Sequence, residues 1–196
     1  MNTQKNKLSG EFDARKLIEN KFAALFETGR EYVNPGVRVG ESAFLKEQNG
    51  LLAKKNIAQG SVILIQKSIP GSLRSKYTIQ VSEELHVKPG FFGKFINHSC
   101  DPDTAVFFRL SKDKSHATIM VITLRDIQRG EEITYDYSTT EEYLSEETTD
   151  TPCLCASEKC RNKITGFCDL PENEKERLGS SGLLSAYIAD HYIEHF

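Results

Sequence analysis

The stretch FINHSCDP at residues 95–102 places an amide, an imidazole, a hydroxyl and a thiol in consecutive positions, from Asn97 to Cys100. The segment before them, residues 91–96, is largely apolar and rich in phenylalanine. Polar chemistry gathered on one short loop beside an apolar segment is typical of a functional site rather than of a simple connection. This stretch is therefore the leading candidate for such a site.

Two later stretches are equally distinctive. GEEITYDY at residues 130–137 ends a strand-like run on Tyr135 and Tyr137. CLCASEKC at residues 153–160 holds three cysteines. If residues 133–137 form a strand, the two tyrosines point to the same face, because side chains two positions apart share a face.

Composition and charge narrow the class of protein. The 196 residues fit one domain with short extensions. The net charge is −3 and no basic block stands out, which argues against a nucleic-acid binder held by phosphate contacts. No window has the ~18 apolar residues of a membrane span, and the polar residues 1–10 carry no secretory signal. We therefore expect an intracellular protein, cytoplasmic or nuclear, without membrane contact.

The apolar pattern predicts a mostly β fold between helical ends. Apolar residues three and four apart predict a helix over 11–28, and further helices are expected over 171–178 and from 183 to the end. Short strands bounded by turn residues are expected over eight segments: 37–39, 43–45, 50–53, 61–65, 77–81, 105–108, 117–124 and 133–137. Many short strands with few helices indicate a β-rich domain.

The cysteines indicate a metal site. Thiolates at C-x-C-x4-C spacing, as in Cys153, Cys155 and Cys160, supply three corners of a tetrahedral zinc site. Without a secretory signal, this spacing favours metal binding over a disulfide framework. Cys100 and Cys168 are the two candidates for the fourth ligand, and the alternative is a set of reduced thiols without a metal.

Together, in this order, the three stretches resemble the SET-domain family of protein lysine methyltransferases with a cysteine-rich post-SET segment. The resemblance covers roughly residues 40–165. It implies the β-clip fold of several short sheets with a knot-like crossing at the 95–102 stretch. The expected organisation is an N-terminal helical extension over 1–36, the SET domain over 37–138, an acidic connector and post-SET zinc segment over 139–168, and a C-terminal helical tail over 169–196.

The resemblance also implies S-adenosylmethionine as cofactor. The family's Gly-x-Gly stretch reads Gln48-Asn49-Gly50 here, so its first glycine is absent. Asn97 is expected at the amino-acid end of the cofactor and the backbone of His98 at the adenine. The full set of expected contacts is Gly50, Leu51, Leu52, Asn97, His98, Tyr137 and Leu154. In the family the cysteine of the 97–100 stretch completes a structural zinc site, so the expected ligands are Cys100, Cys153, Cys155 and Cys160, with Cys168 left as a free thiol.

The family assigns catalysis to the two tyrosines. Methyl transfer to an amine is an in-line displacement that needs an aligned, neutral amine. A lysine pKa of about 10.4 must therefore be lowered, and a narrow apolar channel beside a positive sulfonium does this. Tyr137 is expected to orient the amine, and Tyr135 to limit the product to mono- or dimethyl-lysine. Glu131 and Glu132 are interpreted as a solvated turn rather than as a catalytic pair, because charged side chains mostly face water.

The target stays open at this stage. The expected partner is a protein that presents a lysine, a histone or another, and the segment between Ile65 and Phe91 is expected to help form its groove. That segment carries Lys67, Arg74 and Lys76, so it is not an acidic surface built for a strongly basic tail. Two rival hypotheses are a methyltransferase acting on a small amine or peptide, and a SET-fold binding module without catalysis. The oligomeric state is not indicated.

Overall fold

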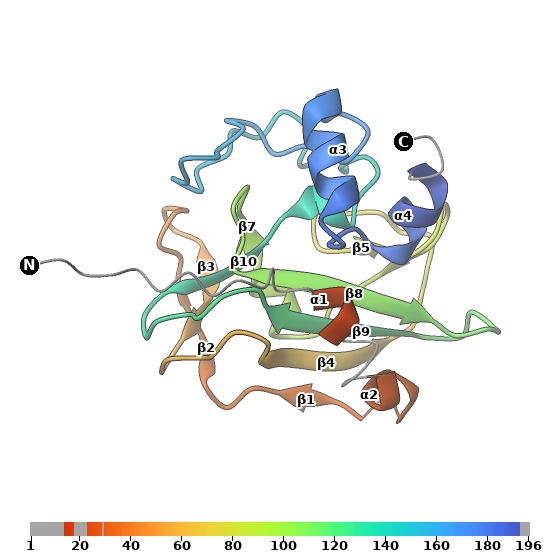
Figure 1. The fold of residues 1–196 in the computed structure, drawn as a ribbon, viewed down its shortest axis with the longest axis horizontal. Coiled ribbons are helices and arrows are strands. Elements are labelled where there is room, and N and C mark those ends of the chain that lie inside the picture. The colour runs from red at the N-terminus through yellow and green to blue at the C-terminus, as the bar shows by residue number, and fades with distance from the viewer. Residues whose placement is uncertain (1–13, 18–22, 29, 193–196) are drawn as a thin grey trace, which may run out of the picture.

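The computed structural model describes residues 14–17, 23–28 and 30–192. Its strands form three small sheets (Figure 1), as expected for a mostly β protein. The first sheet has the order β1-β4-β9-β8, the second β2-β3-β10-β7, and the third is the β5-β6 pair. The bounds are β1 Tyr32–Val33, β2 Val37–Glu41, β3 Asn49–Ala53, β4 Val62–Ser68, β5 Ile79–Gln80, β6 His86–Val87, β7 Asn97–His98, β8 Thr104–Leu110, β9 Ala117–Thr123 and β10 Glu132–Tyr135.

The parallel pairing of β7 with β10 brings two of the distinctive stretches together. Asn97 lies opposite Thr134, and His98 lies opposite Tyr135. The backbone N–H of Ser99 continues the ladder by donating to the Tyr135 carbonyl at 3.1 Å. The 95–102 stretch therefore lies directly beside the 132–137 stretch at the edge of the second sheet.

The main core fills the space between the first two sheets. Leu51 of β3, Ile63 of β4 and Ile133 of β10 are all fully buried in it. Strand β9 is buried along its whole length, because its alternate residues pack on opposite faces. Ile119 and Val121 join the main core, while Met120 and Ile122 join a smaller cluster on the other face.

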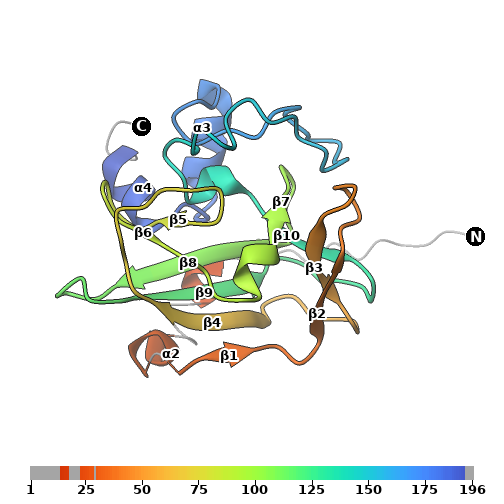
Figure 2. The same cartoon turned by 180° about the vertical axis from the view of Figure 1, so that it is seen from behind.

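Helices cover the remaining surfaces. The N-terminal helices α1 (Ala14–Leu17) and α2 (Ala23–Thr28) agree with the expected helical segment, and residues 18–22 lie outside the described residues. Leu17 and Leu25 pack on the smaller cluster, so this segment caps the outer face of the first sheet. Figures 1 and 2 show α1 against that face and α4 beside the β5-β6 pair.

The C-terminal tail forms α3 (Glu172–Ser180) and α4 (Ala186–Tyr192) around its own apolar cluster. Pro171 is the N-cap residue of α3 rather than its first helical residue. Two 3₁₀ turns, η2 (Gly93–Phe95) and η3 (Tyr137–Thr139), flank the site strands. Among the described residues, no helix is long and apolar enough to cross a membrane.

Three strand predictions were wrong in whole or in part. The strand expected over 77–81 is reduced to the two residues of β5. Residues 43–45 form a turn, because the Ser42 hydroxyl accepts hydrogen bonds from the backbone N–H groups of Phe44 and Leu45. Strand β10 ends at Tyr135, and Tyr137 begins η3. The two tyrosines therefore do not share a face through strand alternation.

Candidate active site and metal centre

The tyrosines nevertheless come together. The ring centroids of Tyr135 and Tyr137 lie 4.8 Å apart. The Tyr137 hydroxyl donates to the carbonyl of Ile96 at 3.2 Å, just before β7. Burial raises the pKa of both phenols above their ordinary value, so both stay protonated at neutral pH.

The imidazole of His98 links the tyrosines to the cysteines. The backbone N–H of Tyr137 donates to His98 Nδ1 at 3.2 Å, which places the ring proton on Nε2. Nε2 lies 3.3 Å from Cys100 Sγ and can donate to it. Burial lowers the pKa of His98 to about 4, despite the nearby Asp136 carboxylate, so the ring is neutral at pH 7. Both ring nitrogens of His98 therefore have partners, and the ring connects the Tyr137 backbone to Cys100.

A cavity of about 580 Å³ lies beside β7. Its volume falls in the ~300–1,000 Å³ range of small-molecule sites. Asn97 lines it, together with Gln48, Asn49, Ser75, Tyr77, Lys88, Pro89, Lys94 and Phe95. The sequence reasoning missed Lys88 and Lys94, whose charges suit an anionic group on a ligand.

Of the predicted cofactor contacts, Asn97 alone lines this cavity among the described residues. The side chains of Leu51 and Leu52 are buried, so only their backbone is available to a ligand. His98, the second residue of β7, is buried and does not line the cavity. Leu154 is exposed at 56% in the cysteine-rich segment.

Glu132 holds the side chain of Asn97 on the wall of this cavity, and its predicted place in a solvated turn was wrong. It is only 4% exposed. Its carboxylate accepts the Asn97 amide at 2.6 Å, the Ala43 backbone N–H at 2.6 Å and the Ser42 hydroxyl at 2.8 Å. A Cβ on Gly50 would lie 2.3 Å from Glu132 Oε1, so any other residue here would displace this carboxylate. Little in the sequence indicated that Glu132 is buried, because the adjacent Glu131 suggested a charged turn.

A second, narrow cavity of about 20 Å³ contains the tyrosines. That volume has room for about one water. Tyr135, Tyr137 and Glu141 line it, with Ser75, Lys76, Thr78, Leu144, Ser145 and Thr148 around them. Ser75 lines both cavities, so the two lie next to each other along the β7-β10 pair.

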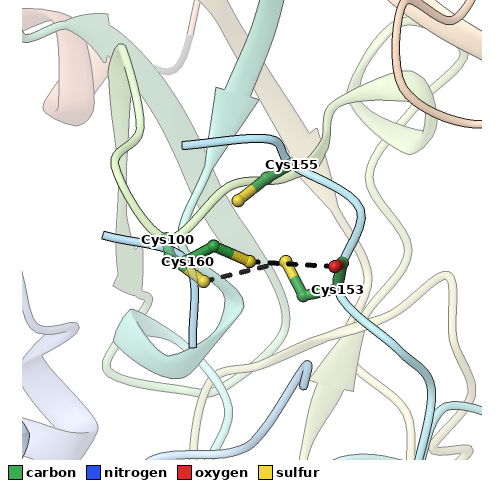
Figure 3. Close-up of side chains that lie close together, drawn as sticks. All are labelled: Cys100, Cys153, Cys155 and Cys160. Atoms are coloured by element: carbon green, nitrogen blue, oxygen red, sulfur yellow. Dashed lines mark hydrogen bonds between the residues drawn. The ribbon is translucent and has the colours of Figure 1, made fainter. Parts of the chain in front are cut away.

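The four expected cysteines form one cluster (Figure 3). The Sγ atoms of Cys100, Cys153, Cys155 and Cys160 all lie within 4.8 Å of one another. The Cys100 and Cys153 sulfurs are 3.7 Å apart, against about 3.8 Å for two corners of a tetrahedral zinc site with Zn–S bonds of about 2.3 Å. Cys168 lies apart, against the C-terminal apolar cluster.

The surroundings of the sulfurs also fit a metal centre. The backbone N–H groups of Arg161 and Asn162 donate to Cys100 Sγ and Cys160 Sγ, both at 3.4 Å. Burial raises the pKa of the Cys100 thiol to about 11, and a bound cation would favour its thiolate form. The donor set and its spacing therefore fit a closed, four-thiolate zinc site.

A buried ion pair ties this cluster to the tyrosines. The Arg161 guanidinium binds both oxygens of Asp136 at 2.7 Å. Burial alone would raise the pKa of Asp136, but Arg161 holds it below its ordinary value. Because Asp136 stands between Tyr135 and Tyr137, the cysteine-rich segment is anchored on the turn that η3 begins, the candidate active-site turn.

Comparison with known proteins agrees with this geometry. The SET domain profile matches residues 48–138. A histone-lysine N-methyltransferase, H3 lysine-4 specific, from Aspergillus oryzae is 31% identical over 131 residues, which cover 57% of this chain and 10% of the relative. A histone-lysine N-methyltransferase, H3 lysine-9 specific KMT1, from Fusarium mangiferae is 39% identical over 75 residues, which cover 35% of this chain and 22% of the relative.

Among solved structures, KRYPTONITE in complex with mCHG DNA and SAH aligns with a TM-score of 0.51 at 24% identity, over 65% of this chain and 28% of that one. This likeness concerns the fold. The chain thus spans a small part of the length of the relatives it matches. The profile match, the relatives and the mostly β architecture agree on one assignment. Residues 48–138 match the SET domain, and the relatives that the chain resembles over this region are histone-lysine N-methyltransferases.

Proposed function

We propose that the chain transfers a methyl group from S-adenosylmethionine to the ε-amine of a protein lysine. The observation that carries this proposal is the position of Tyr137. Its hydroxyl is held at the Ile96 carbonyl, next to Asn97 on the wall of the larger cavity, and its side chain lines the narrow cavity. A group in the narrow cavity can therefore meet a cofactor in the larger one beside a fixed phenol.

The larger cavity would hold the cofactor through Asn97, through the backbone of residues 48–52 and of His98, and through contacts with Tyr137 and Leu154. S-adenosylmethionine supplies a methyl group on a positively charged sulfur. Lys88 and Lys94 line the cavity and offer cations for the cofactor's carboxylate. Glu132 fixes the Asn97 amide, so the binding geometry is preorganised.

The narrow cavity would receive the lysine. Tyr135 and Tyr137 surround the amine, and the Tyr137 hydroxyl and the Ile96 carbonyl orient its lone pair toward the methyl carbon. At about 20 Å³ the cavity is too narrow for a lysine side chain, so residues 75–78 or 144–148 must move apart on binding. Four cysteine thiolates, Cys100, Cys153, Cys155 and Cys160, would hold a structural Zn²⁺ that keeps the 153–160 segment on the active-site turn.

For the substrate, we propose a histone or another protein that presents a lysine. The relatives are named for histone H3 lysine-4 or lysine-9 activity, which supports histone H3 as the first candidate and the nucleus as the place of action. With Tyr135 at the switch position, the proposed products are mono- and dimethyl-lysine. Direct binding of nucleic acid is not part of this proposal, because the chain carries no basic block.

The test uses the chain with methyl-labelled S-adenosylmethionine, core histones and a whole-cell lysate, beside a Tyr137→Phe variant. Mass spectrometry should find label on lysine, and the variant should lose about 10²-fold or more in rate because one positioned hydroxyl is absent. Cofactor binding without transfer to any protein would instead favour a small amine as substrate. No cofactor binding at all would favour a binding module without catalysis.

A further inference from the structure

Glu141 is a buried carboxylic acid in the wall of the narrow cavity. It is 7% exposed and lines that cavity together with Tyr135 and Tyr137. Its position is fixed by η3, since its backbone N–H donates to the Tyr137 carbonyl at 3.0 Å. The carboxyl group therefore belongs to the same small chamber as the two phenols.

The two oxygens of this carboxyl group differ in their partners. Oε1 accepts the backbone N–H of Gln80 at 2.9 Å and the Thr140 hydroxyl at 3.3 Å. In the described part of the chain, Oε2 receives no hydrogen bond and forms no ion pair. A carboxylate oxygen that accepts no hydrogen bond within the chain can accept one from a ligand in the cavity.

The neighbouring Glu142 differs from Glu141 in that both of its carboxylate oxygens accept hydrogen bonds within the chain. It accepts hydrogen bonds from the hydroxyls of Tyr187 and Tyr192 of α4 and from the Gln80 amide. Its backbone N–H donates to the Gln80 side chain at 2.9 Å. These bonds clamp the segment between β5 and α4 and hold Glu141 in place, so that its free oxygen is available to the cavity.

The charge environment suits proton exchange near neutral pH. Burial raises the pKa of Glu141 to about 7, against the lowering effects of the Gln80 N–H and the Arg74 charge. The other titratable groups on the cavity wall are Lys76, Tyr135 and Tyr137. Both phenols stay neutral at this pH, so Glu141 is the acid in the chamber that changes charge.

We propose that Glu141 binds the ammonium group of the target lysine and accepts the proton which that lysine must lose before methyl transfer. This inference rests on the proposed lysine methyltransferase function. An N–H bond of the ammonium breaks and its proton moves to Oε2. The freed lone pair forms the N–C bond, while the C–S bond breaks and leaves its electron pair on sulfur. The methylated ammonium departs, and Glu141 returns its proton to water.

A pH–rate profile tests this role. Single-turnover transfer from S-adenosylmethionine to recombinant histone H3, or to a peptide around a lysine labelled in the lysate, is measured from about pH 6 to about pH 9. The unmodified chain should lose rate below about pH 7, as Glu141 becomes protonated. In Glu141→Gln the transfer rate at neutral pH should fall about 10²–10⁴-fold. The rate should then rise steadily with pH, because only the solvent can take the proton from the lysine.

Glu142→Gln is the matched control. The pH–rate profile of this variant should keep the shape of the unmodified profile. Its absolute rate can change, because Glu142 accepts hydrogen bonds from Tyr187 and Tyr192 of α4. An unchanged profile shape in Glu141→Gln would overturn the proposal and leave the methyltransferase function standing. Absence of transfer by the unmodified chain to any protein lysine would overturn both.

A binding measurement supplies a readout without turnover. In the presence of S-adenosylhomocysteine, peptides with lysine or the uncharged norleucine at the target position are compared by calorimetry at about pH 8. The ratio of the two affinities should shift about tenfold against lysine in Glu141→Gln, because a charge-assisted hydrogen bond is lost. An unchanged ratio, in a variant that still binds S-adenosylhomocysteine, would contradict ammonium binding by Glu141.

Discussion

The Asn97 amide donates to the Glu132 carboxylate at 2.6 Å and so joins β7 to β10 through side chains as well as backbone. The same amide donates to the Asn49 carbonyl at 3.2 Å. One side chain of the candidate cofactor site is therefore oriented by a buried acid that makes no predicted contact with the cofactor.

We predict that Glu132→Gln weakens both stability and cofactor binding. The glutamine keeps one acceptor but presents an NH₂ group to donors, which leaves a buried donor unsatisfied and costs about 1–3 kcal/mol of the free energy of unfolding. Urea unfolding and calorimetric titration with S-adenosylhomocysteine measure the two effects. Glu131→Gln, at a partly exposed position paired with Arg125, is the control and should change neither by more than about 0.5 kcal/mol.

We predict that Gly50→Ala acts through the same acid. The added Cβ would approach Glu132 Oε1 to 2.3 Å, so the carboxylate must move and release the Asn97 amide. Cofactor affinity should fall about tenfold or more, corresponding to the loss of about one hydrogen bond to a charged group. Affinity equal to that of the unmodified chain would show that Glu132 can shift without disturbing Asn97.

Metal removal should release the cysteine-rich segment. We expect one zinc per chain by elemental analysis, and its loss on treatment with a strong chelator or in Cys153→Ser. Loss of a structural site removes folding free energy and should lower both the melting temperature and the rate of transfer. Cys168→Ser should retain the metal, because that thiol lies outside the cluster.

Asp103 predicts a pH-dependent stability. Burial raises its pKa to about 7, although the Thr134 backbone N–H and Arg125 lower it. Because the pKa is raised in the folded state, the contribution of Asp103 to stability is fully present below the unfolded pKa of about 4. That contribution is lost as the pH rises through about 7. Asp103→Asn should flatten this decline, by an amount on the order of a few kcal/mol. Urea unfolding at a series of pH values measures it.

A control for Asp103 is available on the β8–β9 hairpin. Hydrogen bonds from Ser111 and Ser115 lower the pKa of the exposed Asp113 to about 2. Asp113→Asn should therefore change the pH dependence of the stability only in the acid range, below about pH 4, where that group gains its proton. A flattened curve between about pH 4 and about pH 7 in the control as well would remove Asp103 as the cause.

Tyr135→Phe should change the products rather than abolish the reaction. Its hydroxyl is buried beside the Tyr137 ring, and removing it leaves room for a further methyl group on the amine. Mass spectrometry of the substrate should show trimethyl-lysine in the variant and mono- or dimethyl-lysine in the unmodified chain. Identical product distributions would refute a role for Tyr135 as the switch.

Much of the architecture could be predicted from local pattern. The strands over 105–108 and 117–124 follow from continuous apolar runs, and the cysteine spacing identified the cluster before its geometry was known. The turn at 43–45 could not be predicted, because an apolar trio resembles a strand and the deciding hydrogen bonds come from Ser42. Local chemistry outweighed apolar pattern at that point.

Glu132 and Glu141 escaped prediction for a different reason. Each lies in an acidic segment, and burial depends on partners far away in sequence: Ser42 and Asn97 for the first, Gln80 for the second. The pairing of β7 could not be predicted either, because a strand of two residues is too short to show an alternating apolar pattern. The residues that fix the site are therefore those whose environment is made by tertiary contacts.

The cysteine cluster also closes a long loop of the chain. Cys100 follows β7 directly, whereas its partner Cys153 comes 53 residues later. Closing a loop of this length carries an entropic cost, and a metal held at both ends would offset it in the folded chain. The kinetics of metal uptake should therefore report how fast the two ends of this loop come together.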